Sequence, residues 1–240
     1  MAVTGAGSGL GACIAKRFSS AGDVLILLGR TEGPLRSVAA ELANACAVYL
    51  LDVSQKAQVE EVFSQIYHDF GRIDRLVNCA GVGIYNLAEN LSKEDVDAMI
   101  DTNLKGTIYA TQAVLPRMKA ADAGYLINVI SLSGKRAVST ESVYCASKFG
   151  ADGFAKAVAL ELAETNIRVS NFYMGNMATN LWRGTRAEEQ DLFLRPEDVA
   201  DIIYMNTRIR NRMLVTEVSI QNFLGSGHRG PNDYDAQTER

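Results

Sequence analysis

The segment Thr4-Gly5-Ala6-Gly7-Ser8-Gly9-Leu10-Gly11 decides how this chain folds. It follows a short apolar run and precedes Ala12-Cys13-Ile14-Ala15-Lys16-Arg17-Phe18, in which apolar residues recur at helical spacing. A strand, a glycine-rich turn and a helix in this order point free backbone N–H groups and the positive end of the helix dipole at a pyrophosphate. Glycine lets such a ligand approach because it carries no Cβ.

The letters of this turn fit two registers. Gly5, Gly9 and Gly11 match the pattern G-x-x-x-G-x-G. Gly7, Gly9 and Ala12 match the pattern G-x-G-x-x-A. We prefer the first register, because it keeps the turn compact directly after the strand. The alternative to a phosphate-binding turn is a turn that only packs the helix against the strand.

Outward from this turn, short runs rich in Val, Ile and Leu alternate with longer segments of helical period. This alternation predicts an α/β, doubly wound (Rossmann) fold, with a parallel sheet and helices on both faces. We expect seven strands, at Met1–Thr4, Val24–Leu28, Ala47–Leu51, Arg75–Asn78, Tyr125–Ile130, Arg168–Phe172 and Met213–Ile220. The longest helix is expected at about Ser142–Glu164. We expect residues 1–224 to form one domain and residues 225–240 to form a polar C-terminal tail.

The composition excludes several classes of protein. Of the 240 residues, 48% are hydrophobic and 22% are charged, which suits one compact domain and excludes a disordered chain. Lys and Arg number 24 against 28 Asp and Glu, so no positive excess is available for nucleic acid or an anionic membrane. Four scattered cysteines and two histidines indicate neither a metal site nor a disulfide framework. Because neither a membrane span nor a signal peptide is apparent, we expect a cytoplasmic protein.

Further motifs follow the glycine turn along the chain. They are Asp52-Val53, Asn78-Cys79-Ala80-Gly81, Asn103, Ser131 and Tyr144-Cys145-Ala146-Ser147-Lys148. With the turn, they resemble the short-chain dehydrogenase/reductase superfamily over nearly the whole chain. The resemblance implies an oxidoreductase that uses a nicotinamide dinucleotide to interconvert a secondary alcohol and a ketone or aldehyde. It also implies a homodimer or homotetramer that pairs through two long helices, at about residues 102–119 and 142–164.

The resemblance further implies which residues bind the cofactor. They are Gly5, Gly7, Ser8, Gly9, Leu10, Arg30, Thr31, Asp52, Val53, Asn78, Ala80, Gly81, Tyr144, Lys148, Gly175, Met177 and Thr179. By resemblance, Asp52 accepts from the adenine amino group, residues 78–81 pack on the adenosine ribose and Thr179 binds the carboxamide. An aspartate after a strand is otherwise more often a helix cap. Met174 stands where the family usually has a proline, which relaxes that turn.

The end of the second strand distinguishes NADP from NAD. An acidic side chain there accepts from the adenosine ribose hydroxyls, whereas an arginine pairs with a 2′-phosphate. The strand ends in Gly29-Arg30-Thr31-Glu32, so Gly29 leaves the acidic position empty and Arg30 offers a guanidinium. We therefore predict NADP(H). NAD stays the alternative, because Glu32 is close enough to compete and Ser8 stands where many NADP-preferring relatives carry a basic residue.

Tyr144 and Lys148 are four residues apart in a predicted helix, so both lie on one helix face. Carbonyl reduction needs a proton for the developing alkoxide, and a tyrosine with a pKa of about 10 is a poor base at neutral pH. A nearby ammonium favours the phenolate, and the oxidised nicotinamide adds a second positive charge. We predict that Tyr144 is the acid/base and that Lys148 lowers its pKa. By resemblance, Lys148 also holds the nicotinamide ribose.

Two polar residues complete the predicted catalytic set. Ser131 precedes Tyr144 by thirteen residues, as the family's serine does, and its hydroxyl can stabilise charge on the substrate oxygen. Ser133 is the rival serine. Asn103 resembles the helix asparagine that holds a water linking the lysine to solvent. Its alternative role is that of a buried amide tying the helix to a strand, and both roles can coexist.

The substrate side is less defined by the sequence, which favours a small alcohol or carbonyl compound. We expect residues 180–195 to form a lid, whose arginines permit an acidic group on the substrate unless they are simply solvated. The pocket walls are expected at Gly83, Tyr85, Val138 and Tyr173. An alternative from another class is a regulator that binds NADP(H) without turnover and would not need the tyrosine or the lysine.

Overall fold

The structure is a computed structural model that describes residues 1–179, 193–209 and 213–222. In this part of the chain, parallel strands form a seven-stranded sheet in the order β3-β2-β1-β4-β5-β6-β7. The strands are β1 (Ala2–Thr4), β2 (Leu25–Gly29), β3 (Cys46–Leu50), β4 (Arg75–Asn78), β5 (Gly124–Val129), β6 (Ile167–Met174) and β7 (Glu217–Ile220). The predicted doubly wound sheet is confirmed, although its seventh strand begins four residues later than expected.

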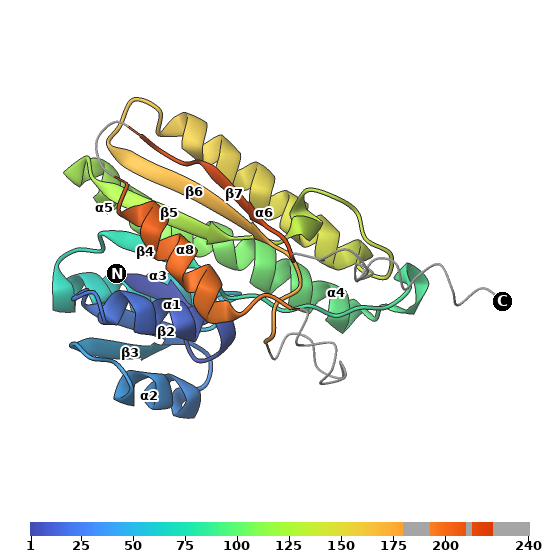
Figure 1. Ribbon diagram of the computed structural model, residues 1–240, viewed down its shortest axis with the longest axis horizontal. Helices are drawn as coiled ribbons and strands as arrows, with labels where there is room; N and C mark the ends of the chain where they lie inside the picture. Colours follow the sequence, from blue (N-terminus) through green and yellow to red (C-terminus); the bar gives the residue numbers. More distant parts are fainter. Residues whose placement is uncertain (180–192, 210–212, 223–240) are drawn as a thin grey trace.

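Helices connect the strands and cover both faces of the sheet (Figure 1). They are α1 (Gly9–Ser19), α2 (Glu32–Ala40), α3 (Lys56–Phe70), α4 (Lys93–Met99), α5 (Gly106–Ala121), α6 (Ser142–Glu161) and α8 (Pro196–Thr207). Short turns of 3₁₀-helix occur at η1 (Ala88–Asn90) and η3 (Leu132–Gly134), and the π-helical turn η2 (Ile100–Lys105) joins α4 to α5. The longest helix is α6, as predicted, and it ends three residues early.

The period of two along a strand divides the core between these faces. In β1, Val3 packs in a cluster with Ile14 and Phe18 of α1, whereas Ala2 packs in a second cluster with Phe63 and Val114. The first cluster also contains residues of α8, and the second contains residues of α3 and α5. Strands covered in this way need apolar side chains on both faces, which explains the continuous apolar runs in the sequence.

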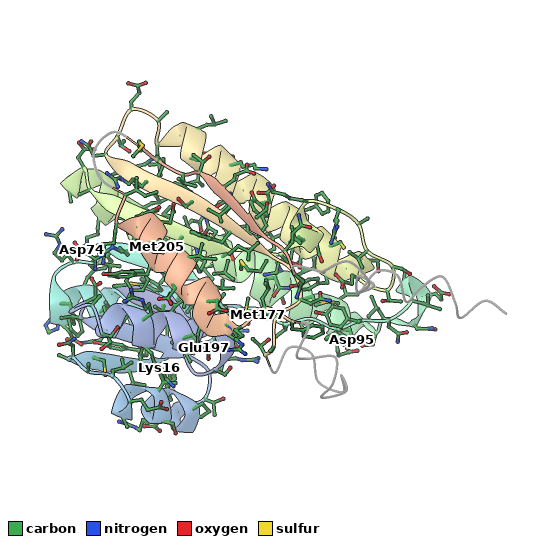
Figure 2. All side chains as sticks on the ribbon, in the orientation of Figure 1. Lys16, Asp74, Asp95, Met177, Glu197 and Met205 are labelled. Atoms are coloured by element: carbon green, nitrogen blue, oxygen red, sulfur yellow. The ribbon has the colours of Figure 1, made fainter. Side chains whose placement is uncertain are left out.

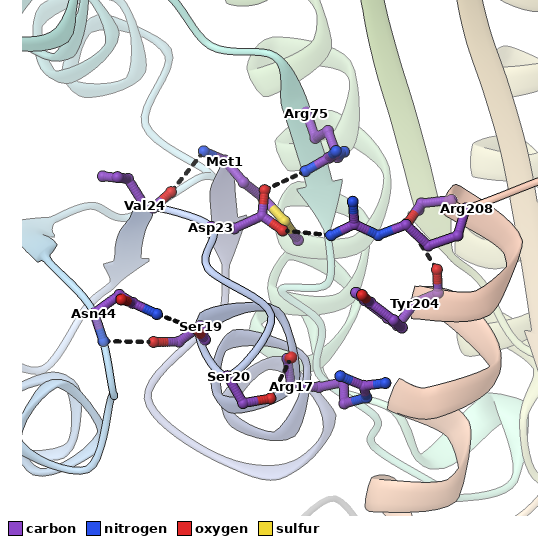
Figure 3. A network of polar contacts seen from close by, with 11 residues as sticks. Met1, Arg17, Ser19, Ser20, Asp23, Val24, Asn44, Arg75, Tyr204 and Arg208 are labelled. Atoms are coloured by element: carbon purple, nitrogen blue, oxygen red, sulfur yellow. Dashed lines mark hydrogen bonds and ion pairs between the residues drawn. The ribbon is translucent and has the colours of Figure 1, made fainter.

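Polar contacts close the amino ends of the strands (Figure 3). Asp23, just before β2, pairs with Arg75 of β4 at 2.5 Å and with Arg208, just after α8, at 3.2 Å. The amino group of Met1 donates to the Val24 carbonyl at 2.9 Å. These contacts join β1, β2, β4 and α8 at one edge of the core.

Helix α8 runs from this edge toward the opposite end of the sheet. Figure 2 shows Met205 near one end of the helix and Glu197 near the other, with Met177 close to Glu197. Pro196 occupies the first turn of α8, where its missing N–H costs no helical hydrogen bond. None of the helices in the described ranges is both long and apolar enough to cross a lipid bilayer.

Candidate active site

A cavity of about 850 Å³ lies at the carboxyl ends of the strands. It opens where the strand order reverses, since β1 has β2 on one side and β4 on the other, and this crevice is the usual ligand site of such sheets. Residues predicted to bind the cofactor that line the cavity are Gly5, Gly7, Ser8, Gly9, Leu10, Arg30, Thr31, Asp52, Val53, Ala80, Gly81, Tyr144, Lys148, Gly175, Met177 and Thr179. The fold therefore gathers nearly the whole predicted set around one space.

The glycine turn shapes one wall of this cavity. Gly5 and Gly9 have φ angles of +68° and +51°, which glycine adopts without strain. A Cβ on Gly11 would lie 2.3 Å from the Gly5 carbonyl oxygen, so α1 could not pack this closely on the turn with any other residue. These constraints fit the register Gly5, Gly9 and Gly11. The Ser8 side chain makes no capping hydrogen bond to the helix. The start of α1 therefore fits a phosphate group on its backbone N–H groups.

Arg30 and Thr31 line the cavity at the end of β2. The Arg30 side chain is exposed and forms no ion pair with the described residues, so it is available to bind an anion. Glu32, the possible competitor, forms an ion pair with Arg36 at 2.7 Å and does not line the cavity. This arrangement fits a phosphate at the end of β2 better than a ribose held by an acid.

Asp52 combines the two roles considered for it. It lines the cavity, and its Oδ1 accepts hydrogen bonds from the Ser54 backbone N–H at 3.0 Å and the Ser54 hydroxyl at 2.7 Å. One carboxylate oxygen thus shapes the turn before α3. This leaves Oδ2 as the oxygen that suits a ligand.

Asn78 differs from its predicted role as a cofactor-binding residue. Its side chain is buried, and it donates to the Thr111 hydroxyl at 3.0 Å and to the Asn128 amide oxygen at 2.9 Å. The Asn128 amide in turn donates to Asn171 at 2.9 Å. This ladder joins β4, β5 and β6, because their asparagines lie in register. The cavity wall at this point is formed instead by residues 79–82.

Tyr144 and Lys148 project from α6 into the same cavity as Ser131. The Lys148 Nζ lies 5.7 Å from the centroid of the Tyr144 ring and donates to the Val129 carbonyl at 3.4 Å. Ser131 lies close enough to Tyr144 to lower the pKa of the phenol. Ser131, which follows β5, thus lines the same cavity as two residues of α6. The structure brings together the three side chains that the sequence suggested.

Electrostatics at Tyr144 differ from the prediction. Burial raises the pKa of Tyr144, the nearby Ser131 side chain opposes this rise, and the charge of Glu141 adds to it. Burial also lowers the pKa of Lys148 to about 8. The pKa of Tyr144 is therefore raised rather than lowered in this structure, because loss of solvent around the phenol is the largest effect.

Asn103 lies in η2, with 1% of its surface exposed, and takes the role of a buried tie. Its side-chain oxygen accepts from the Val82 N–H, and its amide donates to the Val82 carbonyl, both at 2.8 Å. The amide also donates to the Ser147 hydroxyl at 3.0 Å. A Cβ on Gly81 would lie 3.3 Å from Asn103 Oδ1 and 3.5 Å from Lys148 Nζ. Asn103 therefore holds the loop after β4 against α6 beside the lysine.

The predicted pocket walls are only partly correct. Val138 lines the cavity, whereas Tyr173 is fully buried and donates to Asp152 at 2.5 Å. Side chains alternate along β6, so Tyr173 and Met174 point to opposite faces of the strand. Met174 reaches the cavity, whereas Tyr173 points toward Asp152 of α6. Tyr85 packs edge-on against Tyr144, with ring centroids 5.6 Å apart, and neither it nor Gly83 lines the cavity.

The lining residues that were not among the predicted site residues include three polar side chains near Tyr144: Ser133, Arg136 and Glu141. The Ser133 hydroxyl donates to Glu141 Oε2 at 2.6 Å, which separates the role of Ser133 from that of Ser131. The signal for Glu141 was its position three residues before Tyr144, which places both on one side of the helix start. Most of the predicted lid, with Trp182, and the predicted tail at residues 225–240 lie outside the described residues.

Comparisons with known proteins are consistent with this geometry. A family model described as short chain dehydrogenase matches residues 1–190. An uncharacterized oxidoreductase of Staphylococcus epidermidis is 33% identical over 219 residues, which cover 91% of this chain and 95% of that protein.

Solved structures extend the similarity to the fold. A metagenomic short-chain oxidoreductase in complex with NADP is 30% identical, with a TM-score of 0.81, and the match covers 93% of this chain and 96% of that one. A serine dehydrogenase complexed with NADP⁺ is also 30% identical, with a TM-score of 0.82 and coverage of 91% and 92%.

Proposed function

The chain belongs to the short-chain dehydrogenase family and is an oxidoreductase, and from this premise we propose that it interconverts a secondary alcohol and a ketone or aldehyde with NADP(H). The observation that carries the proposal is the meeting of Ser131, Tyr144 and Lys148 in the cavity that the glycine turn lines. Two structural neighbours that are complexed with NADP or NADP⁺ support the choice of cofactor.

The proposal assigns the residues of the cavity to the parts of NADP(H). Gly5 and Gly9 with the start of α1 hold the pyrophosphate, and Arg30 with Thr31 holds the 2′-phosphate. Asp52 and Val53 contact the adenine, and Ala80 and Gly81 pack on the adenosine ribose. At the other end Gly175, Met177 and Thr179 hold the nicotinamide carboxamide.

The chemistry at the far end of the cavity belongs to the protein's own side chains. The bound nicotinamide supplies the acceptor or donor of a hydride at the carbinol carbon. In alcohol oxidation, the Tyr144 oxygen takes the hydroxyl proton and later releases it to solvent, which gives the carbonyl product, NADPH and one proton. In reduction, the Tyr144 phenol returns that proton to the substrate oxygen. Ser131 donates a hydrogen bond to the same oxygen as its charge grows.

Lys148 and Asn103 hold the rest of the machinery in place. The ammonium of Lys148 binds the nicotinamide ribose hydroxyls, and its buried side chain lines the cavity. Asn103 fixes the loop that carries Gly81 against α6. The π-helical turn places its side chain there.

The proposal also covers the domain organisation of the chain and its oligomeric state. Residues 1–224 form one oxidoreductase domain, and two or four copies pair through α5 and α6. Support for pairing comes from Phe149 and Leu160 of α6, which are 44% and 79% exposed in the single chain.

The substitution Tyr144→Phe tests the function directly. We expect it to lower kcat/KM for NADPH-dependent reduction of small ketones by about 10³-fold, because the acid is gone, while NADPH affinity measured by fluorescence changes little. If the variant keeps wild-type turnover, the assigned chemistry is wrong. If the wild-type protein binds NADPH but turns over no carbonyl compound or alcohol, a regulator that senses the cofactor explains the fold better.

A further inference from the structure

Glu141 is a buried carboxylate that the reaction described above does not use. It precedes α6, has 9% of its surface exposed, and lines the cavity beside Ser131 and Tyr144. Its charge reaches Tyr144, because it contributes to raising the pKa of that phenol. The carboxylate therefore lines the same cavity as the residues assigned to the reaction.

Within the described residues, the partners of Glu141 compensate its charge only in part. Its Oε2 accepts from the Ser133 hydroxyl at 2.6 Å. Arg136, a lining residue, attracts the carboxylate, yet in the described part of the chain no cationic nitrogen forms an ion pair with it within 4.0 Å. A neutral hydroxyl at one oxygen satisfies one acceptor site and leaves the second oxygen without a charged partner.

Burial makes this arrangement costly unless a cation completes it. An ionised carboxylate removed from water is stabilised by an opposite charge and hydrogen bonds together, and removing one member of such a pair is strongly destabilising. Burial accordingly raises the pKa of Glu141, and Ser133 and Arg136 only oppose that rise. A substrate hydroxyl would add a hydrogen bond but no charge. An ammonium would add both.

We propose that Glu141 binds an ammonium group that the substrate carries next to its carbinol carbon, so that the substrates are small amino alcohols and the corresponding amino ketones. This inference rests on the proposed oxidoreductase function and specifies its substrate class. Tyr144 and Ser131 take the substrate oxygen, and the Glu141 carboxylate takes the ammonium on the neighbouring carbon. Glu141 and Tyr144 are three residues apart at the start of α6, so their side chains lie on one side of the helix start.

Binding of the ammonium also acts on the tyrosine. The negative charge of Glu141 raises the pKa of Tyr144, and it does the same to Tyr85 and Cys145 beside it. An ammonium paired with Glu141 cancels this effect at the moment when Tyr144 must accept a proton. The correct substrate thus improves the base that acts on it, which a neutral alcohol cannot do.

A matched pair of alcohols tests the inference. 1-Amino-2-propanol and 2-butanol share the carbinol and differ in an ammonium against a methyl group. With NADP⁺, wild-type enzyme is expected to favour the amino alcohol in kcat/KM by at least about tenfold, and Glu141→Gln to lower that ratio by at least about tenfold. The control Glu89→Gln removes an exposed carboxylate in η1 and is expected to keep the wild-type ratio.

Binding gives a second readout that does not depend on turnover. Calorimetric titration of 1-amino-2-propanol into the Tyr144→Phe enzyme with NADP⁺ is expected to show binding that the added Glu141→Gln substitution weakens by at least about tenfold. If Glu141→Gln lowers kcat/KM for both alcohols equally, Glu141 only positions Ser133 and the inference is overturned. If no alcohol or ketone turns over but this binding difference appears, the inference stands and the proposed oxidoreductase chemistry fails.

Discussion

The two ends of the sheet differ in whether the charged groups near them are paired. At the amino end, Asp23 lies between Arg75 and Arg208, so each charge has a partner (Figure 3). At the carboxyl end, Lys148 and Glu141 are buried in the cavity wall and form no ion pair within the described residues. Charged groups near the amino ends of the strands are thus paired, whereas the two buried charged groups near the carboxyl ends are not paired within the described residues.

We infer from this difference that the charged groups at the amino end stabilise the fold, whereas those at the carboxyl end act on a ligand. The decrease in the pKa of Lys148 to about 8 corresponds to a cost of about 3 kcal/mol at neutral pH. Partly exposed ion pairs at the amino end each contribute about 1 kcal/mol or less. The carboxyl end therefore holds its charges at the expense of stability, as expected where a ligand supplies the missing partners.

The largest effect expected from removing one hydroxyl separates two serines of the carboxyl end. Ser131→Ala is expected to lower kcat/KM by about 10²- to 10³-fold, because Ser131 lies beside Tyr144 and donates to the substrate oxygen in the proposed reaction. Ser133→Ala is expected to have a smaller effect, since Ser133 bonds Glu141 instead. The exposed Ser139, changed to Ala, serves as a control in the same assay. A larger loss for Ser133→Ala would reverse the assignment.

Lys148→Met tests whether the carboxyl end gives up stability for function. Because folding lowers the pKa of Lys148 from 10.5 to about 8, the unfolded chain binds more protons between these values, and wild-type stability rises as the pH increases through this window. We expect the variant to be inactive but more stable than wild type below pH 8, by about 3 kcal/mol, and to lose this advantage near pH 10.5.

Urea unfolding of both proteins at pH 7 and near pH 10.5 measures the effect of Lys148→Met. Groups other than Lys148 titrate in both proteins, so the difference between the two free energies of unfolding isolates this lysine. A variant that is less stable than wild type at pH 7 would contradict the account.

Asp23→Ala tests whether the paired charges at the amino end contribute to stability and not to activity. The substitution leaves Arg75 and Arg208 without their partner, and we expect the free energy of unfolding to fall by about 1–2 kcal/mol. Because the change is remote from the cavity, kcat/KM of the folded enzyme is expected to match wild type. Thermal unfolding and steady-state kinetics measure the two quantities, and a loss of activity below the unfolding transition would show that the two ends are coupled.

Much of the fold was predictable because it follows from local patterns. Each strand is a short apolar run, and the glycine turn marks the switch from β1 to α1 in adjacent residues. The π-helical turn at η2 was not predicted, since its i→i+5 bonding leaves no signature in apolar spacing.

The site was predictable where motif spacing fixes geometry and not where tertiary packing does. Tyr144 and Lys148 meet because one helix carries both. Asn78 and Tyr173 miss the cavity because strand alternation turns their side chains toward the helices. The pKa of Tyr144 depends on how completely the fold removes water from it, which residue identity alone does not reveal.

The central claim is that the carboxyl end is built for NADP(H), and comparative titration with NADPH and NADH tests it most directly. Nicotinamide fluorescence reports binding to wild type and to Arg30→Ala. The account predicts that wild type binds NADPH at least about tenfold more tightly than NADH, and that Arg30→Ala removes this difference by weakening NADPH alone. Tighter binding of NADH by wild type, or equal weakening of both dinucleotides by the substitution, would contradict it.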